Sequence, residues 1–502
     1  MTALGERLAR KPEGYRFTVG RVLAIYAGLM TVLMLAALDQ TIVATALPRI
    51  VSEIGGLTSY SWVITSYMLA STVTVPLYGK LGDVFGRRTL FIVAITIFLV
   101  GSALCGLAQN MTELVLFRAV QGLGAGGLFP LALATVGVIV PPRDRGRYQG
   151  LIGATFAFAS IAGPALGGFI VDHASWRWIF YVNLPVGALA LIVISITMPK
   201  RTEKREHSID YRGFFLLAAG TTSLLLALVW AGRQYAWSSA PVIGAFAAAA
   251  GALILFAWIE LSVKEPILPF DLLKQRTVAA GVASVALVGM AMFGTIAFVP
   301  LFVQGVIGTS ATSSGVVLTP LMLGAVGMSI LSGQWVSRTG RYRLNAIVGP
   351  IILATGLFLL SRMNTSTTNG EAARNMVIVG IGIGLMMQVF VLVVQNSVPL
   401  RQMGSATALT QFSRQIGATV GVTLMGVIVN QGLPKNIGGG GEIVHRLPAR
   451  LRDDLASALQ PAFLVSAVLC LVVLVIVIVG IREVPLRKGF EEPTLADELG
   501  QG

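Results

Sequence analysis

The chain has 502 residues, of which 55% are hydrophobic and only 12% charged, and its mean hydropathy is +0.79. This composition indicates a polytopic membrane protein and excludes folding around one soluble core. The two cysteines, Cys105 and Cys470, lie in apolar runs without a partner at metal or redox spacing, so we interpret them as packing residues.

The apolar runs, taken in chain order, predict membrane-spanning helices, each of which needs about 20 residues. We expect fourteen, at residues 20–47, 60–78, 89–108, 112–138, 148–171, 178–198, 211–231, 240–261, 278–303, 313–335, 344–361, 375–395, 402–430 and 461–481. Strand-like alternation is absent, and open sheets cannot face lipid. The predicted fold class is therefore an all-α polytopic membrane protein. The first run lacks a small-residue cleavage site, so we expect no cleaved leader.

The distribution of Lys and Arg predicts the orientation, because basic residues gather in short cytoplasmic loops. Most of them lie in the two termini and the even-numbered loops, whereas Arg118 and Arg414 lie within predicted spans. Both termini should therefore be cytoplasmic, in a multi-pass protein of the plasma membrane. The net charge of +14 follows from this topology and gives little support to nucleic-acid binding.

An internal repeat indicates two related halves. The repeated spacing joins two sets of residues, Gly79, Asp83 and Gly86 in the first set and Gly333, Ser337 and Gly340 in the second. Two helices fall between six on each side, so we expect two six-helix bundles with an inserted pair, and repeated halves are typical of secondary transporters. The predicted organisation is an N-terminal segment 1–19, a bundle 20–198, a loop 199–210, the inserted helices 211–261, a linker 262–277, a bundle 278–481 with an outer loop 431–460, and a tail 482–502.

One carboxylate, that of Asp39, lies deep in an apolar run, where such a group is costly and indicates a functional site. At 1.5 Å per residue it lies about 12 Å below the outer helix end, and Arg118 lies about 9 Å below the outer end of the fourth span. The matching depths predict a proton-coupling pair, because separating or wetting it would change proton affinity. A static ion pair that fixes helix packing is one alternative. A substrate anchor at Asp39, alone or in turn with the proton, is another. Glu113 is a second candidate partner of Arg118.

Five motifs resemble those of one transporter family. They are Leu38-Asp39-Gln40-Thr41-Ile42-Val43 through Pro48, Gly79-Lys80-Leu81-Gly82-Asp83-Val84-Phe85-Gly86-Arg87-Arg88, Arg118-Ala119-Val120-Gln121-Gly122-Leu123-Gly124, Gly163-Pro164-Ala165-Leu166-Gly167-Gly168, and Trp176-Arg177-Trp178-Ile179-Phe180 with Asn183 and Pro185. The second resembles the loop signature of the major facilitator superfamily, the third that of its proton-coupled members, and the fourth that of its antiporters, with Ala159 in place of the usual first glycine. The combination, over nearly the whole chain, resembles the fourteen-helix drug:proton antiporters of the EmrB/QacA type.

The loop motif predicts a conformational latch at Gly79, Asp83, Gly86, Arg87 and Arg88. Asp83, placed in a Gly-rich cytoplasmic turn, could rest against the positive N-terminus of a neighbouring helix. The repeat has Ser337 at the matching position, so a charged latch should be one-sided. The resemblance implies a role for this loop in the conformational change.

The fifth-span motif predicts a hinge or close helix crossing at Gly163, Pro164, Gly167 and Gly168. Plain helix packing without gating explains the same residues equally well.

The substrate cavity is predicted from residue type, because promiscuous apolar sites favour aromatic residues and Met with a few polar anchors. Arg414 lies roughly 18 Å from the cytoplasmic start of its helix, so we expect it to face the central cavity rather than lipid. The candidate lining residues are Trp62, Tyr67, Glu113, Gln121, Phe156, Phe158, Tyr181, Asn183, Met290, Phe293, Gln304, Gln388, Phe390, Gln411 and Arg414.

These features predict a transporter that exports amphipathic small molecules in exchange for protons, with the bilayer, protons and substrate as its partners. The sequence has no phosphate-binding loop of the form Gly-x-x-x-x-Gly-Lys-[Ser/Thr], and neither a cofactor nor a metal is expected. A dedicated proton-coupled exporter of one endogenous metabolite, lipid or antibiotic is an alternative. A membrane-embedded enzyme would need a site built from His173, His207 and Cys105, which lie scattered without ligand spacing.

Overall fold

Helices make up the regular structure of the described part of the chain in this computed structural model, apart from an isolated β-bridge between Ala231 and Tyr235. The structure describes residues 17–55, 60–199, 210–232, 234–263, 266–268, 270–307, 311–432, 449–483 and 486. Two short helices, α7 (Trp178–Tyr181) and α11 (Asp271–Lys274), a π-helical turn (Val303–Ile307) and a 3₁₀ turn (Leu400–Gln402) accompany the longer helices.

A helix or a pair of consecutive helices covers each of the fourteen predicted spans. These are α2 (Val19–Ile54), α3 (Tyr60–Phe85), α4 (Arg87–Leu107), α5 (Met111–Ile139), α6 (Pro142–His173), α7 with α8 (Asn183–Thr197), α9 (Tyr211–Trp230), α10 (Ala240–Glu260), α12 (Arg276–Phe302), α13 (Ala311–Thr339), α14 (Arg343–Ser361), α15 (Asn369–Met386) with α16 (Val389–Asn396), α17 (Met403–Gly432) and α18 (Ala449–Gly480). In the described residues, eleven segments are long and apolar enough to cross a membrane, and α3, α6 and α13 are not among them. The all-α polytopic fold is thus confirmed, while fourteen crossings stay a prediction.

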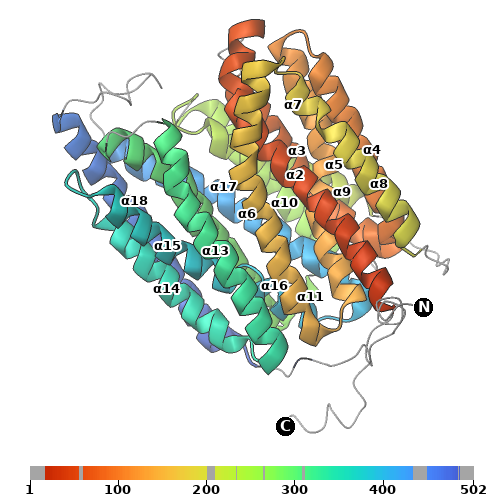
Figure 1. Cartoon of the computed structure of the whole chain (residues 1–502). Helices are drawn as coiled ribbons and strands as arrows, with labels where there is room; N and C mark the ends of the chain where they lie inside the picture. The colour runs from red at the N-terminus through yellow and green to blue at the C-terminus, as the bar shows by residue number, and fades with distance from the viewer. Residues whose placement is uncertain are drawn as a thin grey trace, which may run out of the picture.

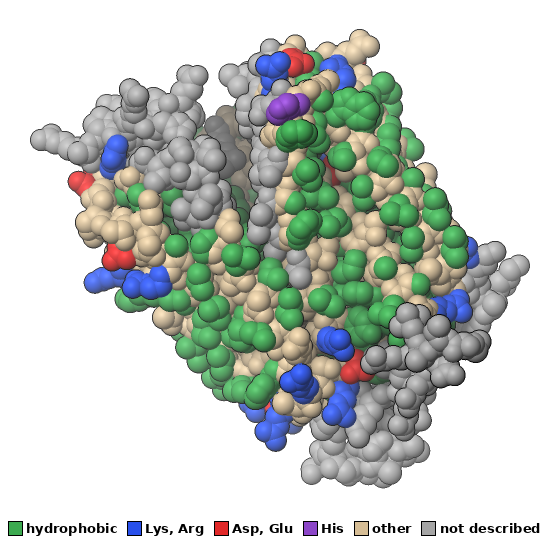
Figure 2. Space-filling model, in the orientation of Figure 1, with side chains coloured by type: hydrophobic (Ala, Val, Ile, Leu, Met, Phe, Trp, Pro, Cys, Tyr) green, Lys and Arg blue, Asp and Glu red, His purple; other side chains and the backbone are tan. Residues whose placement is uncertain are grey.

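The helices of the first half lie side by side on one side of the molecule, and α13, α14, α15 and α18 lie on the other (Figure 1). The start of α2 and the end of α18 lie at the same end of the bundle, which we call the terminal end (Figure 1). In Figure 2, hydrophobic side chains form a broad band, and the charged side chains gather toward the two ends of the helices. This distribution is the one expected of a protein whose helices face lipid over their middle.

Helices α9 and α10, between the two predicted bundles, pack against each other, and α9 also contacts α3 and α17. An apolar cluster joins this pair to helices of the second half, through Leu217, Phe256, Val278 and Leu409. Helix α9 therefore lies against the seam at which the two halves meet.

The two halves meet along two seams, α3 against α17 and α6 against α13. Glycines permit the close approach at both: a Cβ at Gly79 would collide with Gly404 and Ala408, and one at Gly333 would collide with Gly146. These contacts all lie toward the terminal end of their helices. The halves are therefore packed tightly together at that end.

Two local expectations were wrong. The segment after residue 78 was expected to be a Gly-rich turn, but α3 continues to Phe85 and the break falls at Gly86, with φ of 89°. Gly79 serves helix packing at the seam rather than a turn. Similarly, α18 begins at Ala449 and contains Pro461. Part of the predicted outer loop 431–460 is thus helical, and residues 433–448 lie outside the described part of the chain.

Candidate functional site: a buried carboxylate and a gated seam

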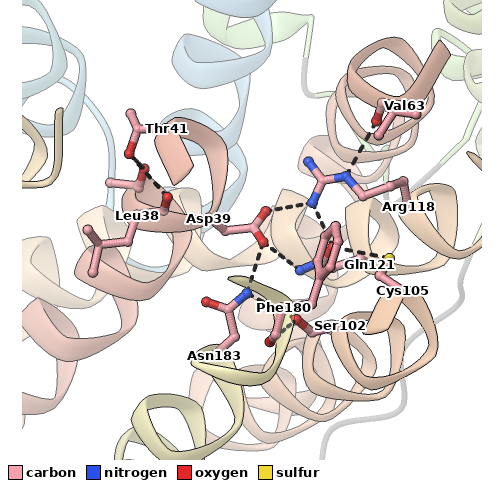
Figure 3. A network of polar contacts seen from close by, with 11 residues as sticks. Leu38, Asp39, Thr41, Val63, Ser102, Cys105, Arg118, Gln121, Phe180 and Asn183 are labelled. Atoms are coloured by element: carbon pink, nitrogen blue, oxygen red, sulfur yellow. Dashed lines mark hydrogen bonds and ion pairs between the residues drawn. The ribbon is translucent and has the colours of Figure 1, made fainter. Parts of the chain in front are cut away.

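The carboxylate of Asp39 is fully buried on α2 and accepts hydrogen bonds from three side chains (Figure 3). Its Oδ2 accepts from Nη1 of Arg118 at 2.8 Å. Its Oδ1 accepts from Nε2 of Gln121 at 2.8 Å and from Nδ2 of Asn183 at 2.9 Å. The donors come from α5 and from the start of α8, so this one carboxylate joins three helices of the first half.

The guanidinium of Arg118 is held on several sides. Its Nη1 also donates to Oε1 of Gln121 at 2.7 Å, one turn along α5, and its Nε donates to the carbonyl of Val63 at 3.4 Å. The ring of Tyr67, on the same helix as Val63, lies against the guanidinium, with 4.1 Å between Cζ and the ring centroid. Arg118 therefore ties α3, as well as α2, to α5.

A relay of hydrogen bonds from α4 and the α7–α8 junction orients Asn183. Its Nδ2 also donates to Oγ of Ser102 at 3.0 Å, and that hydroxyl donates to the carbonyl of Phe180 at 2.9 Å. The aromatic motif at 176–180 anchors this junction, because Trp176 and Phe180 are buried and stack edge to face. The motif therefore fixes the backbone that presents Asn183 to Asp39.

A buried ion pair is a poor source of net stability, because desolvation of both charges offsets their attraction. Protonation of the carboxylate in any such pair removes one of the two charges and leaves the other without a counter-ion. Thr41, which follows in the motif, donates to the carbonyl of Ala159 on α6 at 3.1 Å. Movement of α2 near Asp39 and Thr41 would therefore change its contacts with α5, α8 and α6 together.

At the terminal end, Asp83 caps the first helical turn of α17. Its Oδ1 accepts from the amide of Gly404 at 3.1 Å, and its Oδ2 accepts from the amide of Ser405 at 3.0 Å. Arg87 donates to Oδ1 of the same carboxylate at 2.8 Å, and Arg88 donates to the carbonyl of Ser195. A carboxylate at a helix N-terminus is stabilised by the unpaired amides and the helix dipole. Of the predicted latch residues, Asp83 and Gly79 thus contact α17 across the seam between the halves, whereas Arg87 and Arg88 bond within the first half.

At the second seam, between α6 and α13, the repeat of the motif has Ser337 at the position of Asp83. Ser337 donates to Oδ1 of Asp144 at 3.2 Å, and Arg143 donates to the carbonyl of Ser337 at 3.4 Å. The carboxylate at this seam therefore comes from α6 of the first half rather than from the repeated motif. Gln149 adds a bond across the halves, donating to Oε1 of Gln395 at 3.0 Å.

In the fifth-span motif, Gly163 provides a close crossing with α2, because a Cβ there would collide with Thr41. Gly167 is buried, and Gly168 has open space where a Cβ would project. The side chain of Pro164 lies outside the described residues. The geometry shows packing at Gly163, and a hinge at this motif stays a prediction.

The residues predicted to line a substrate cavity lie in several different places. Gln121, Asn183 and Tyr67 belong to the Asp39 network, while Glu113 binds the amide of Gln109 and the side chain of Asn110 at the start of α5. Tyr181 packs where a Cβ on Gly106 would lie.

The remaining candidates have little in common. Gln388 and Gln411 are buried, each with an Oε1 that has no hydrogen-bond partner among the described residues. Trp62 and Met290 are half-buried, Phe390 is buried and Phe158 is exposed. The side chains of Phe156 and Gln304 lie outside the described residues. Among the candidates whose side chains the structure describes, only Phe293 lines the cavity described next.

A cavity of about 680 Å³ lies between α3, α9, α12 and α17, in the half of the bundle away from the terminal end. Its wall is mainly aliphatic and aromatic, with threonine hydroxyls, and contains no Asp, Glu, Lys or Arg among the described residues. Lining residues include Ile64, Met68, Leu228, Phe293, Val422 and Thr423. The contribution of α9 could not be predicted from sequence, because nothing in its apolar run distinguishes a lipid-facing side from one that covers the seam.

The comparisons with known proteins agree with this geometry. Residues 29–422 match the model of the Major Facilitator Superfamily. A multidrug transporter protein of Bacillus subtilis is 41% identical over 81% of this chain and 75% of its own length, and multidrug resistance protein 3 of the same species is 37% identical over 80% and 79%. The structure of the human organic anion transporter MFSD10 aligns over 93% of this chain and all of that one with a TM-score of 0.66; at 14% identity this likeness shows the fold alone. The chain belongs to the Major Facilitator Superfamily and is a multi-pass membrane transporter rather than an enzyme.

Proposed function

We propose that this transporter is a proton-coupled antiporter that exports amphipathic small molecules by alternating access. The observation that carries the proposal is the Asp39 carboxylate, fully buried and bound by Arg118, Gln121 and Asn183. The printed names of the Bacillus relatives, a multidrug transporter and a multidrug resistance protein, support export of drug-like compounds. We also propose fourteen membrane crossings of the EmrB/QacA type, cytoplasmic termini and a plasma-membrane location, on the basis of the sequence motifs and the Lys and Arg distribution.

In this proposal the structure is the state closed at the terminal end. Closure rests on the bond between Asp83 and α17 and on the glycine contacts of both seams. A proton that reaches Asp39 weakens its hold on Arg118, and this frees α2 and α5 to move relative to each other. That motion, transmitted through α3, breaks the Asp83 contact and opens the terminal end to substrate.

Transport into proteoliposomes under an imposed pH gradient tests the proposal, with ethidium, rhodamine 6G and 8-anilinonaphthalene-1-sulfonate as a panel of fluorescent amphipaths. We expect gradient-driven flux of at least one compound. Asp39→Asn should abolish this acceleration by the gradient and leave passive exchange of the compound. Asp271→Asn, an exposed acid on α11 paired with Lys274, is the matched control and should behave as the wild type. Flux that ignores the gradient, or full coupling in Asp39→Asn, contradicts the proposal.

A further inference from the structure

The middle segments of the helices carry more arginines than acidic residues, and hence an unbalanced positive charge. Asp39, Arg118 and Arg414 are the charged residues more than five positions from a helix end; every other Asp and Glu lies within five positions of a helix end or in the sequence before, between or after the helices. Asp39 is already bound to Arg118. The sequence therefore contains no second interior carboxylate that could neutralise Arg414.

Arg414 lies in the middle of α17 and makes no hydrogen bond or ion pair within the described residues. Its stem and its backbone carbonyl pack against Gly289 on α12. A guanidinium has five N–H donors, and one held inside a membrane protein without an acceptor is costly. The side chain of Arg414 is half-buried, so its donors remain open to an acceptor from outside the chain.

The surroundings of Arg414 connect it with the apolar cavity. Ala418, one turn further along the same face of α17, lines the cavity, and so does Phe293, one turn beyond Gly289 on α12. Gln415, next to Arg414, accepts a hydrogen bond at 2.6 Å from Thr72, which lines the cavity on α3. Arg414 thus lies between α12 and α17, one helical turn closer to the terminal end than the cavity wall.

The threonines of the cavity wall reinforce its apolar character. The hydroxyls of Thr419 and Thr423 donate to carbonyls of their own helix, at 3.1 and 2.9 Å, so their methyl groups and lone pairs are what remains for a ligand. No acidic side chain lines the cavity in the described residues. A cationic substrate would find no carboxylate here, whereas an uncharged hydrocarbon or ring body would fit.

We propose that the transported compound is an amphipathic organic acid, whose apolar body occupies the cavity between α3, α9, α12 and α17 and whose anionic group binds Arg414. This inference rests on the proposed export function and names its substrate class. A carboxylate, sulfonate or phosphate would give the charge-assisted, bidentate bond that a guanidinium favours. The Asp39 pair then serves the proton alone and makes no contact with the substrate.

Two probes that share one body test the inference by equilibrium binding to the purified protein in lipid nanodiscs, without a pH gradient. They are 8-anilinonaphthalene-1-sulfonate and its uncharged analogue N-phenyl-1-naphthylamine. The wild type should bind the sulfonate more tightly after correction for partition into empty nanodiscs. Arg414→Gln should weaken sulfonate binding roughly ten- to a hundredfold, the usual weight of a bond between charged groups, and leave the uncharged probe unchanged. Arg414→Lys should retain part of the preference.

Matched variants separate the charge from the cavity. Gly426 lines the cavity with room for a Cβ, so Gly426→Leu should weaken binding of both probes. Gly251 on α10 also has open space, lies outside the cavity, and Gly251→Leu should change neither. Arg362→Gln, at an exposed arginine, is the charge control. Unchanged binding of the uncharged probe to Arg414→Gln shows that this variant is folded.

Equal affinity of the wild type for both probes overturns the inference, as does equal loss of both in Arg414→Gln. Unaltered binding in Gly426→Leu would also overturn it, because the probes would then bind somewhere other than the cavity. The result is independent of proton coupling: Asp39→Asn should keep the sulfonate preference. A chain that shows this preference but no gradient-driven flux would therefore refute the proposed function and not the site.

Discussion

At the scale of single residues, the Asp39 network shows how a costly group is made tolerable. Three donors satisfy the buried carboxylate, and Ser102 in turn fixes Asn183. Each contact is specific, so the network holds one arrangement of α2, α4, α5 and α8. Removing one partner of such a pair is far more harmful than replacing both, because it leaves an uncompensated charge.

Stability measurements can show this asymmetry. Arg118→Met should lower the free energy of unfolding in detergent by roughly 3–5 kcal/mol, because Asp39 is left buried without its cation. The double variant Asp39→Leu with Arg118→Met should recover most of the loss. Arg362→Met, at an exposed site, is the control. Tryptophan fluorescence during denaturation gives the values, and losses that simply add in the double variant would argue against a coupled pair.

The residue scale is also where sequence reasoning succeeds and fails most clearly. The shared depth of Asp39 and Arg118 pointed to their contact, because charges in a membrane need partners. The sequence predicts that Gln121 and Asn183 line the substrate cavity, whereas in the structure both donate to Asp39. Ser102 could not be identified, since a serine in an apolar run bonds equally well to its own helix. The partners of Gln121, Asn183 and Ser102 depend on contacts between helices that are far apart in the sequence.

At the scale of elements, α3 has two distinct faces. One packs on α5 through Tyr67 and Thr74, where Gly122 and Gly126 leave room, and it reaches the Asp39 network through Arg118. The other borders the cavity and bonds to α17 through Thr72 and Asp83. Helix α3 is thus the element that contacts the charge pair, the cavity and the latch.

The latch can be weakened without changing its size. Asp83→Asn removes the charge that faces the first amides of α17 and should cost the closed seam about 1 kcal/mol, or roughly a fivefold shift of population toward opening at the terminal end. Spin labels at the exposed Phe85 and Leu344, on opposite halves at that end, report the opening as a longer distance. Asp271→Asn is the control. An unchanged distance distribution would mean that Asp83 does not hold the seam.

The ends of a helix could be predicted where the length of an apolar run decides them. The predicted ends were wrong near Gly79 and near Pro461. Gly79 looks like a turn residue, yet it stays helical because α17 comes too close for a side chain. Pro461 looks like a helix start, yet α18 continues through it. At Gly79 the deciding contact comes from a neighbouring helix that the local sequence does not reveal, whereas Pro461 is an exposed residue inside α18.

At the scale of the whole molecule, the two halves of the chain are closed against each other at the terminal end. A cavity lies at the seam of α3 and α17, in the part of the bundle away from that end. The sequence predicted the halves from the repeat, whereas the cover that α9 adds to this seam depends on packing alone. Helix α9 contacts both α3 and α17 and lines the cavity, so the inserted pair is packed into the fold rather than attached at its edge.

The most direct measurement of the central claim is proton movement driven by substrate. In proteoliposomes without an imposed pH gradient, a concentration gradient of the transported fluorescent amphipath should drive protons in the opposite direction, and a trapped pH indicator would record this change. We expect the change in the wild type and in Asp271→Asn, and none in Asp39→Asn. Substrate flux in the wild type without proton movement, or the same proton movement in Asp39→Asn, would contradict the account.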